Sequence, residues 1–240
     1  KVTPKLYQNV GNGSFKDITQ QSGIVHCSYG LGVVTADFNS DGWTDIYIAN
    51  DLDPTDYLFI NQKNGTFKNG MKTHTNQISW FSMGIDANDV NNDGKLDFSV
   101  LDMSPNDHIR SKTLMLPMDP NQWHYLVDNG YQSPYMFNAF QVNNGVDFYS
   151  NISHLTGMAS TDWSWATLLA DFDNDGLKDN FITNGYRKYQ SDNDFVRTFN
   201  AETAKSTFSP EKFLELYEKM PEVPLPNLLF QNKGQFEFEN

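Results

Sequence analysis

One acidic pattern occurs three times along the 240-residue chain and restricts its fold more than any other feature. Each copy reads D-x-[DN]-x-D-G-x-x-D between apolar segments, and the copies begin at residues 37, 89 and 171. A second pattern follows each copy and also occurs alone at 5–15. It consists of an apolar pair, polar residues, a turn with glycine, and an aromatic residue. Self-similarity on this scale indicates a chain built from repeated supersecondary units.

Each complete unit predicts four short strands. In the first unit we expect an inner strand at 32–38, a second strand at 45–49, and a hairpin made of 57–61 and 65–67. An Asn-Gly turn between alternating apolar residues favours such a hairpin. Repeated four-stranded units are typical of β-propeller blades. The sequence therefore predicts an all-β fold of about three and a half blades in one domain, 1–240: an outer hairpin at 4–19 and whole blades at 28–69, 79–150 and 162–239.

The second and third units contain inserts between the second strand and the hairpin, at 103–136 and 185–226. Asp119-Pro120 followed by Gly130 predicts a short helix in the first insert, because aspartate caps helices and proline suits their first turn. Ser209-Pro210 predicts the start of a helix in the second insert, and the prolines after residue 220 end it. Both helices should lie at the same end of the propeller, because they leave equivalent positions of their blades.

Three and a half blades cannot close a ring, and an open propeller exposes sheet edges. We therefore expect this chain to be part of a longer protein that supplies the remaining blades. The alternative is that two copies associate to complete the circle.

The acidic loops have the composition of metal sites. Side-chain oxygens at positions one, three, five and nine, with a backbone carbonyl at position seven, can surround one hard cation, and glycine at position six permits the turn. Oxygen donors of this number favour calcium over magnesium or zinc. An EF-hand is excluded because position twelve is apolar in every copy (Ile48, Val100 and Ile182). We expect about three calcium ions, one per loop, with these ligands: Asp37, Asn39, Asp41, Trp43, Asp45; Asp89, Asn91, Asp93, Lys95, Asp97; Asp171, Asp173, Asp175, Leu177 and Asp179.

The net charge of −13 has the same origin. The chain has 23 Asp against 7 Glu, and ten of the aspartates lie in the three loops. Without those ten, 20 acidic residues face 17 Lys and Arg. This balance argues against a nucleic-acid partner or a basic membrane-binding surface, both of which need clustered cations. The single cysteine, Cys27, excludes an internal disulfide.

The repeats resemble the FG-GAP/VCBS family, whose blades form the propellers of integrin α-subunits. They look most like bacterial surface proteins of the ASPIC/UnbV and cartilage-acidic-protein type. The segments that carry the resemblance are YGLGVVTADFNSDGWTDIYIAND, FSMGIDANDVNNDGKLDFSVLDM and TDWSWATLLADFDNDGLKDNFITNGY. The resemblance implies a seven-bladed propeller, calcium in the loops and an exported location: extracellular, cell-surface or periplasmic. The helical inserts depart from the short integrin-type blade, so integrin ligand binding is not carried over.

Three functions remain open at this point. The favoured one is a non-enzymatic module, stabilised by calcium, that binds a protein or a glycan. A polysaccharide lyase or hydrolase is the alternative, with His154, Tyr186 and Arg187 as candidates by residue type only. The third is an architectural segment of a large surface protein. Trp163 and Trp165 should share a face of their strand, and we interpret them as blade core rather than as a sugar-stacking platform.

Overall fold

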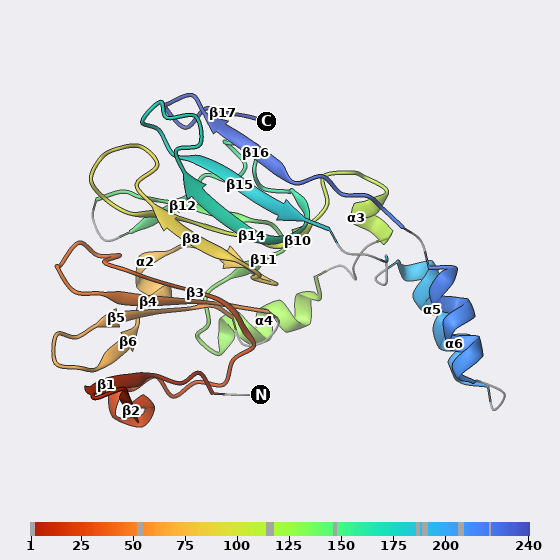
Figure 1. Ribbon diagram of the computed structural model, residues 1–240, viewed down its shortest axis with the longest axis horizontal. Helices are drawn as coiled ribbons and strands as arrows, with labels where there is room; N and C mark the ends of the chain where they lie inside the picture. The colour runs from red at the N-terminus through yellow and green to blue at the C-terminus, as the bar shows by residue number, and fades with distance from the viewer. Residues whose placement is uncertain are drawn as a thin grey trace.

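The computed structural model is mostly β-structure, and it describes residues 3–51, 55–113, 118–145, 148–185, 188, 192–205, 209–220 and 222–240. Three antiparallel sheets lie one above another in chain order (Figure 1). The first sheet has the strand order β3-β4-β5-β6. Its strands are β3 (Gly30–Ala36), β4 (Asp45–Asn50), β5 (Tyr57–Asn61) and β6 (Phe67–Asn69).

The second sheet repeats this order as β8-β9-β12-β13. Its strands are β8 (Ile85–Asn88), β9 (Asp97–Val100), β12 (Ala139–Asn143) and β13 (Tyr149–Asn151). The third sheet contains β14 (Asp162–Ala170), β15 (Asp179–Asn184), β16 (Leu228–Asn232) and β17 (Phe238–Glu239). In each sheet, one acidic loop joins the first of these strands to the second.

The third unit contributes the four expected strands, but its sheet has five. The additional strand, β10 (Met103–Ser104), comes from the insert of the second unit and pairs with the start of β14. This pairing joins segments of consecutive units that are far apart in the sequence, so no local pattern predicts it. A further pair, β7 (Ile78–Ser79) with β11 (Pro134–Tyr135), is parallel and also lies outside the repeat pattern.

The N-terminal segment is the expected hairpin, with β1 (Tyr7–Gly11) paired to β2 (Ser14–Asp17). The short helices α1 (Thr19–Ser22) and α2 (Met71–His74) follow the first and second hairpins of the chain. Leu6 and Ile24 flank the hairpin and α1, and they pack with Ile48 and Phe59 of the first sheet. The hairpin is therefore anchored to the first sheet by apolar contacts.

The inserts contain more helix than the expected two short segments. The first holds α3 (Arg110–Thr113) and α4 (Pro120–Asp128), and Asp119 caps α4 by accepting from the N–H of Asn121, as predicted. The second holds α6 (Pro210–Glu218), capped by Ser209 as predicted, and also α5 (Asn193–Thr203), which we did not predict. Its signals were present: Asp192 caps α5, and Phe195 and Phe199 stack one turn apart.

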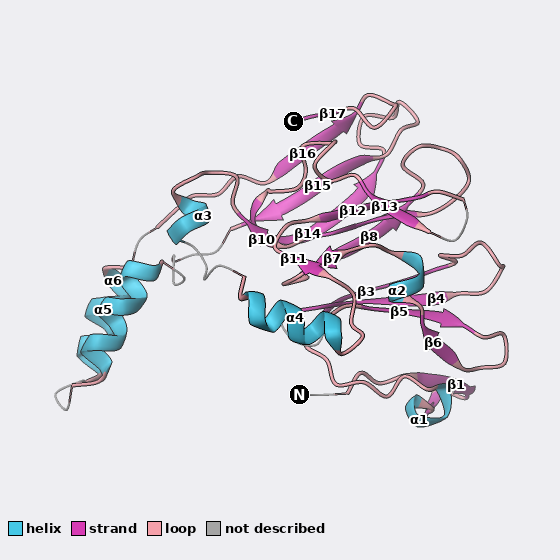
Figure 2. Ribbon diagram, turned by 180° about the vertical axis from the view of Figure 1, so that it is seen from behind, coloured by secondary structure: helices cyan, strands magenta, loops and turns pink. Residues whose placement is uncertain are grey.

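Both inserts leave the molecule at the end opposite the acidic loops. Figures 1 and 2 show α3, α4 and the α5–α6 pair on one side of the sheets, and the turns between the first and second strands on the other. This placement follows from strand direction, because a second strand that begins at the loop must end at the far edge.

The core fills the two spaces between the three sheets. Phe38, Tyr47 and Leu58 of the first unit pack with Phe98 and Tyr149 of the second. Between the second and third sheets, the cluster consists of Val90, Leu101, Phe140, Met158, Leu169, Ile182 and Phe230. Side chains alternate across each strand, so one strand serves two interfaces. In β12, Ala139 thus packs in the cluster shared with the first sheet and Phe140 in the cluster shared with the third.

The two tryptophans expected on one face lie in different environments. Trp163 is 8% exposed and packs with Met83 and Met103, whereas Trp165 is 44% exposed. A break in the pairing register between Ser164 and Ala166 marks a β-bulge at residue 165, which changes the direction of the side chain.

Candidate metal centre

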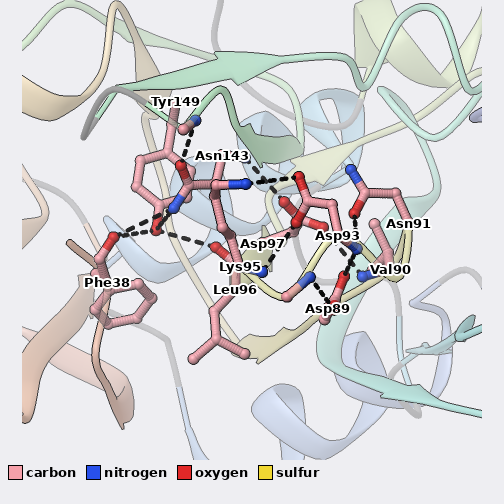
Figure 3. Close-up of polar contacts among 12 residues, drawn as sticks. Phe38, Asp89, Val90, Asn91, Asp93, Lys95, Leu96, Asp97, Asn143 and Tyr149 are labelled. Atoms are coloured by element: carbon pink, nitrogen blue, oxygen red, sulfur yellow. Dashed lines mark hydrogen bonds and ion pairs between the residues drawn. The ribbon is translucent and has the colours of Figure 1, made fainter. Parts of the chain in front are cut away.

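Figure 3 shows the hydrogen bonds of the second acidic loop, which we call loop 2 (89–97). The Asp89 carboxylate accepts from the N–H of Asp93 (3.0 Å) and of Gly94 (2.8 Å). Asn91 Oδ1 accepts from the same Asp93 N–H at 3.0 Å, and Asp93 Oδ1 accepts from the N–H of Lys95 at 2.9 Å. The loop thus folds back over its own first residue, and the side-chain oxygens of positions one and three meet at the N–H of position five.

The other two loops repeat these bonds. In loop 1 (37–45), Asp37 accepts from the N–H of Asp41 (3.0 Å) and of Gly42 (2.8 Å). In loop 3 (171–179), Asp171 accepts from the N–H of Asp175 (3.0 Å) and of Gly176 (2.9 Å). Position four is left-handed in every loop, with φ of 56° at Ser40, 58° at Asn92 and 62° at Asn174.

Glycine occupies position six for its conformation and not for space. Gly42, Gly94 and Gly176 have φ of 85°, 84° and 91°. A Cβ on any of them would meet no atom within 4 Å, so the neighbourhood does not exclude a larger residue. The left-handed backbone conformation is what disfavours a larger residue, because L-residues with a side chain rarely adopt it.

The aspartate at position nine is the buried member of each loop. Asp45 and Asp97 are 0% exposed and Asp179 is 1% exposed. Each accepts the N–H of position two through Oδ2 at 3.0–3.1 Å, and a second N–H from the third strand of its repeat unit through Oδ1 at 2.8 Å. Position nine therefore joins the loop to the hairpin that follows it.

The loops carry more negative charge than the protein offsets. Burial raises the pKa of Asp45, and it raises the pKa of Asp97 to about 6, with Asp93 and Asp89 adding repulsion. Lys63 Nζ lies 3.2 Å from Asp41, and Lys95 Nζ lies 3.4 Å from Asp93. One ammonium beside three carboxylates leaves an excess that a divalent cation would neutralise. An all-oxygen donor set of this kind fits calcium.

Loop 3 brings its carboxylates closest together. Carboxylate oxygens of Asp171, Asp173 and Asp179 lie within 4.8 Å of one another, so a single ion could contact all three. Loops 1 and 2 have asparagine at position three, Asn39 and Asn91, which supplies a neutral oxygen instead. The backbone carbonyls of position seven (Trp43, Lys95 and Leu177) stay predicted ligands. The occupancy of each loop by calcium also stays a prediction.

Three asparagines that we did not predict complete the loops. Asn61, Asn143 and Asn232 are the residues whose N–H binds position nine. Each also folds its own turn, because its side-chain oxygen accepts the N–H two residues later at 2.9 Å. The sequence contained the signal, since asparagine ends the third strand in every unit (FIN, QVN and FQN). Its link to a loop up to 53 residues away in sequence required the fold.

Of the three residues considered for catalysis, only His154 lies in the described part of the chain. His154 is exposed, and its ring packs against Phe137 with centroids 4.7 Å apart. Tyr186 and Arg187 lie outside the described residues. The polysaccharide-active alternative therefore stays a prediction.

A family model described as FG-GAP-like repeat matches residues 2–48 and 37–100. The two matches include loops 1 and 2 with their flanking strands. A comparison with curated proteins found no match. Among the described helices, none is both long and apolar enough to span a membrane.

Proposed function

We propose, from the FG-GAP-like repeats matched over residues 2–100, that this chain is a calcium-binding β-propeller module of an exported protein. The observation that carries the proposal is the recurrence of one hydrogen-bonded loop in all three sheets. In each copy, the carboxylate of position one accepts the backbone N–H groups of positions five and six, and position nine is a buried aspartate.

Calcium in this proposal is structural. Each loop joins the first two strands of its sheet, and its position-nine aspartate is bonded to the third strand. An ion held by positions one to nine would therefore tie three strands together at one edge. It would also offset the repulsion among the loop carboxylates, which otherwise opposes folding.

The partner in this proposal is a protein or a glycan, and the protein itself is not an enzyme. The α5–α6 pair supports a binding role, because it extends away from the sheets (Figure 1). It also carries exposed apolar side chains. Phe213 is 43% exposed and Leu214 is 59% exposed. The polar loops at the opposite end are occupied by the proposed calcium sites, so the insert side is the available surface.

We further propose that additional sheets of the same repeat cover the two outer faces of this stack. Ile85 and Ala87 of β8 pack against the first sheet, and the equivalent Leu169 of β14 packs against the second. Val33, which matches Ile85 in the repeat, is 66% exposed. On the far side of the stack, Leu168 is 50% exposed. The face that is covered by a neighbouring sheet in the second and third sheets is therefore exposed in the first sheet.

Calcium titration by calorimetry tests the proposal directly. We expect binding at up to three sites, a rise in melting temperature with calcium, and a reversal of that rise by chelator. Asp41→Ala should reduce the number of sites by one, whereas Asp128→Ala, at an exposed carboxylate outside the loops, should leave it unchanged. Magnesium at equal concentration serves as the ion control. Absence of binding heat together with an unchanged melt would contradict the calcium proposal.

A further inference from the structure

A buried tyrosine hydroxyl lies between two of the acidic loops. Tyr149 is 0% exposed, and its hydroxyl donates to the backbone carbonyl of Phe38 at 2.7 Å (Figure 3). The same hydroxyl oxygen lies 3.0 Å from the carbonyl of Leu96. Phe38 is position two of loop 1, and Leu96 is position eight of loop 2. Tyr149 thus contacts the backbone of both loops from the last strand of the second sheet.

Asn143 extends this contact to the carboxylates. Its N–H donates to Asp97 Oδ1 in loop 2 at 2.8 Å, and its side-chain Nδ2 donates to the Tyr149 hydroxyl at 3.2 Å. The N–H of Phe38, in turn, donates to Asp45 Oδ2 in loop 1 at 3.0 Å. A continuous set of buried hydrogen bonds therefore joins the position-nine aspartates of the two loops.

The corresponding residues of the other units lack this hydroxyl. Tyr149 stands six residues after Asn143, and the residues six after Asn61 and Asn232 are Phe67 and Phe238. The Asn232 amide donates to the carbonyl of Val90 in the neighbouring loop (2.9 Å), as the Asn143 amide also does to the carbonyl of Phe38 (3.4 Å), so these two units differ in the added tyrosine hydroxyl. The amide of Asn61 donates within its own unit, to the carbonyl of Thr44 at 3.0 Å. Within the described residues, the hydroxyl bridge is thus specific to loops 1 and 2.

We propose that Asn143 and Tyr149 are positioning residues that couple metal binding at loops 1 and 2, so that an ion in loop 2 raises the affinity of loop 1. This inference rests on the calcium binding proposed above. An ion in loop 2 immobilises Asp97, and through it the hairpin that carries Asn143 and Tyr149. The Phe38 carbonyl is then held in place between the two ligand residues Asp37 and Asn39. Loop 1 consequently loses less conformational freedom when its own ion binds. By linkage, an ion in loop 1 must strengthen loop 2 by the same factor.

The chain contains a reporter for loop 1. Trp43 is position seven of that loop, whereas position seven is Lys95 in loop 2 and Leu177 in loop 3. Terbium, which replaces calcium at oxygen sites, emits when a nearby indole transfers energy to it. Terbium emission excited through tryptophan, titrated to saturation, therefore measures the dissociation constant of loop 1 in preference to the other two loops.

The test is a double-mutant cycle with that readout. Asp93→Asn weakens loop 2 at position five without altering the buried hydrogen bonds. We expect it to weaken terbium binding at loop 1 about five-fold or more in the otherwise unchanged protein. In the presence of Tyr149→Phe, the same substitution should weaken loop 1 less than two-fold. Phenylalanine stands at the matching site of both other hairpins, so this variant should fold, and a melting curve checks it.

Two further variants separate coupling from general damage. Asn143→Ala should abolish the coupling as Tyr149→Phe does, whereas Asn232→Ala should leave the five-fold effect on loop 1 intact. If Asp93→Asn weakens loop 1 equally with and without the Tyr149 hydroxyl, the coupling proposal is overturned while calcium binding stands. If terbium and calcium do not bind the unaltered protein at all, the proposed function itself fails.

Discussion

Asp97→Asn separates the two roles that the structure gives to a position-nine aspartate. The carboxylate is fully buried and accepts the N–H of Val90 at 3.0 Å and of Asn143 at 2.8 Å. Asparagine keeps one acceptor oxygen and places an NH₂ against the other donor. One buried N–H is left without a partner, which costs about 1–3 kcal/mol. The fold is otherwise undisturbed, because the two side chains have nearly the same shape.

Without metal, a second effect opposes that loss. Burial, with repulsion from Asp93, raises the pKa of Asp97 to about 6. This pKa lies about two pH units above the ordinary value of aspartate, which means that the ionised carboxylate costs about 3 kcal/mol in the folded state at neutral pH. Asparagine is uncharged and removes this cost. The two effects nearly cancel, so the metal-free variant should unfold within about 2 kcal/mol of the unaltered protein.

With calcium, the cancellation disappears. A site held at one hundred times its dissociation constant contributes about 2.7 kcal/mol to stability. The variant forfeits most of that contribution at loop 2, so its free energy of unfolding should fall by about this amount below the unaltered protein. Urea unfolding in chelator and in saturating calcium measures both values.

Asp86→Asn is the matched control. Asp86 also accepts two backbone N–H groups, from Ala87 at 2.9 Å and Leu169 at 2.8 Å, but it lies outside the loops. Its loss should change stability equally with and without calcium. If Asp97→Asn behaves in the same way, Asp97 serves only as a hydrogen-bond acceptor and our reasoning about the loop is refuted.

Three further predictions concern the packing between sheets. Asp56 is buried against the hydroxyls of Tyr47 and Ser82, and burial raises its pKa to about 7. Between about pH 4 and 7, the folded state therefore keeps a proton on Asp56 that the unfolded state releases. This contribution to stability is present at pH 4 and is lost as the pH rises to 7, by up to about 4 kcal/mol; unfolding of Asp56→Asn across that range should show a flatter pH profile. Val33→Glu, at the open face, should change the free energy of unfolding by less than about 0.5 kcal/mol, whereas Ile85→Glu, at the covered equivalent, should cost more than about 2 kcal/mol by denaturant titration. Equal effects would refute the assignment of the open face. Gly84→Ala should cost about 1–3 kcal/mol in the same assay, because a Cβ there would lie 2.5 Å from the Trp165 carbonyl oxygen, and a variant as stable as the original would show that the two strands separate freely.

Local chemistry explains what could be predicted. Helix α4 was predictable because Asp119 and Pro120 act within one turn, and the hairpin at Tyr57–Asn61 because its turn is encoded beside it. The strands shifted slightly: β3 begins at Gly30 rather than at residue 32, and β6 covers Phe67–Asn69 rather than 65–67. The ends of a strand depend on which residues of the neighbouring strands are available for pairing, and the sequence of that strand alone does not contain this information.

What the local reasoning missed depends on partners far away in the chain. Strand β10 exists because β14 offers it an edge, and Trp165 is exposed because a bulge opposite Asn184 turns it outward. The α5 helix is the exception, because its signals are local: Asp192 caps it, and Phe195 stacks on Phe199 one turn later.

The sequence by itself determined the repeat, the composition of three acidic loops and the positions of their glycines. These properties depend on side-chain chemistry and on turn conformations that span nine residues. Only the tertiary structure decided which groups complete each loop. Asn143 reaches Asp97 across 46 residues, and Tyr149 reaches the carbonyl of Phe38 across 111. Contacts of that range arise because alternating faces of stacked sheets meet, and a hydroxyl at the last strand of one unit then lies against the loop of its neighbour.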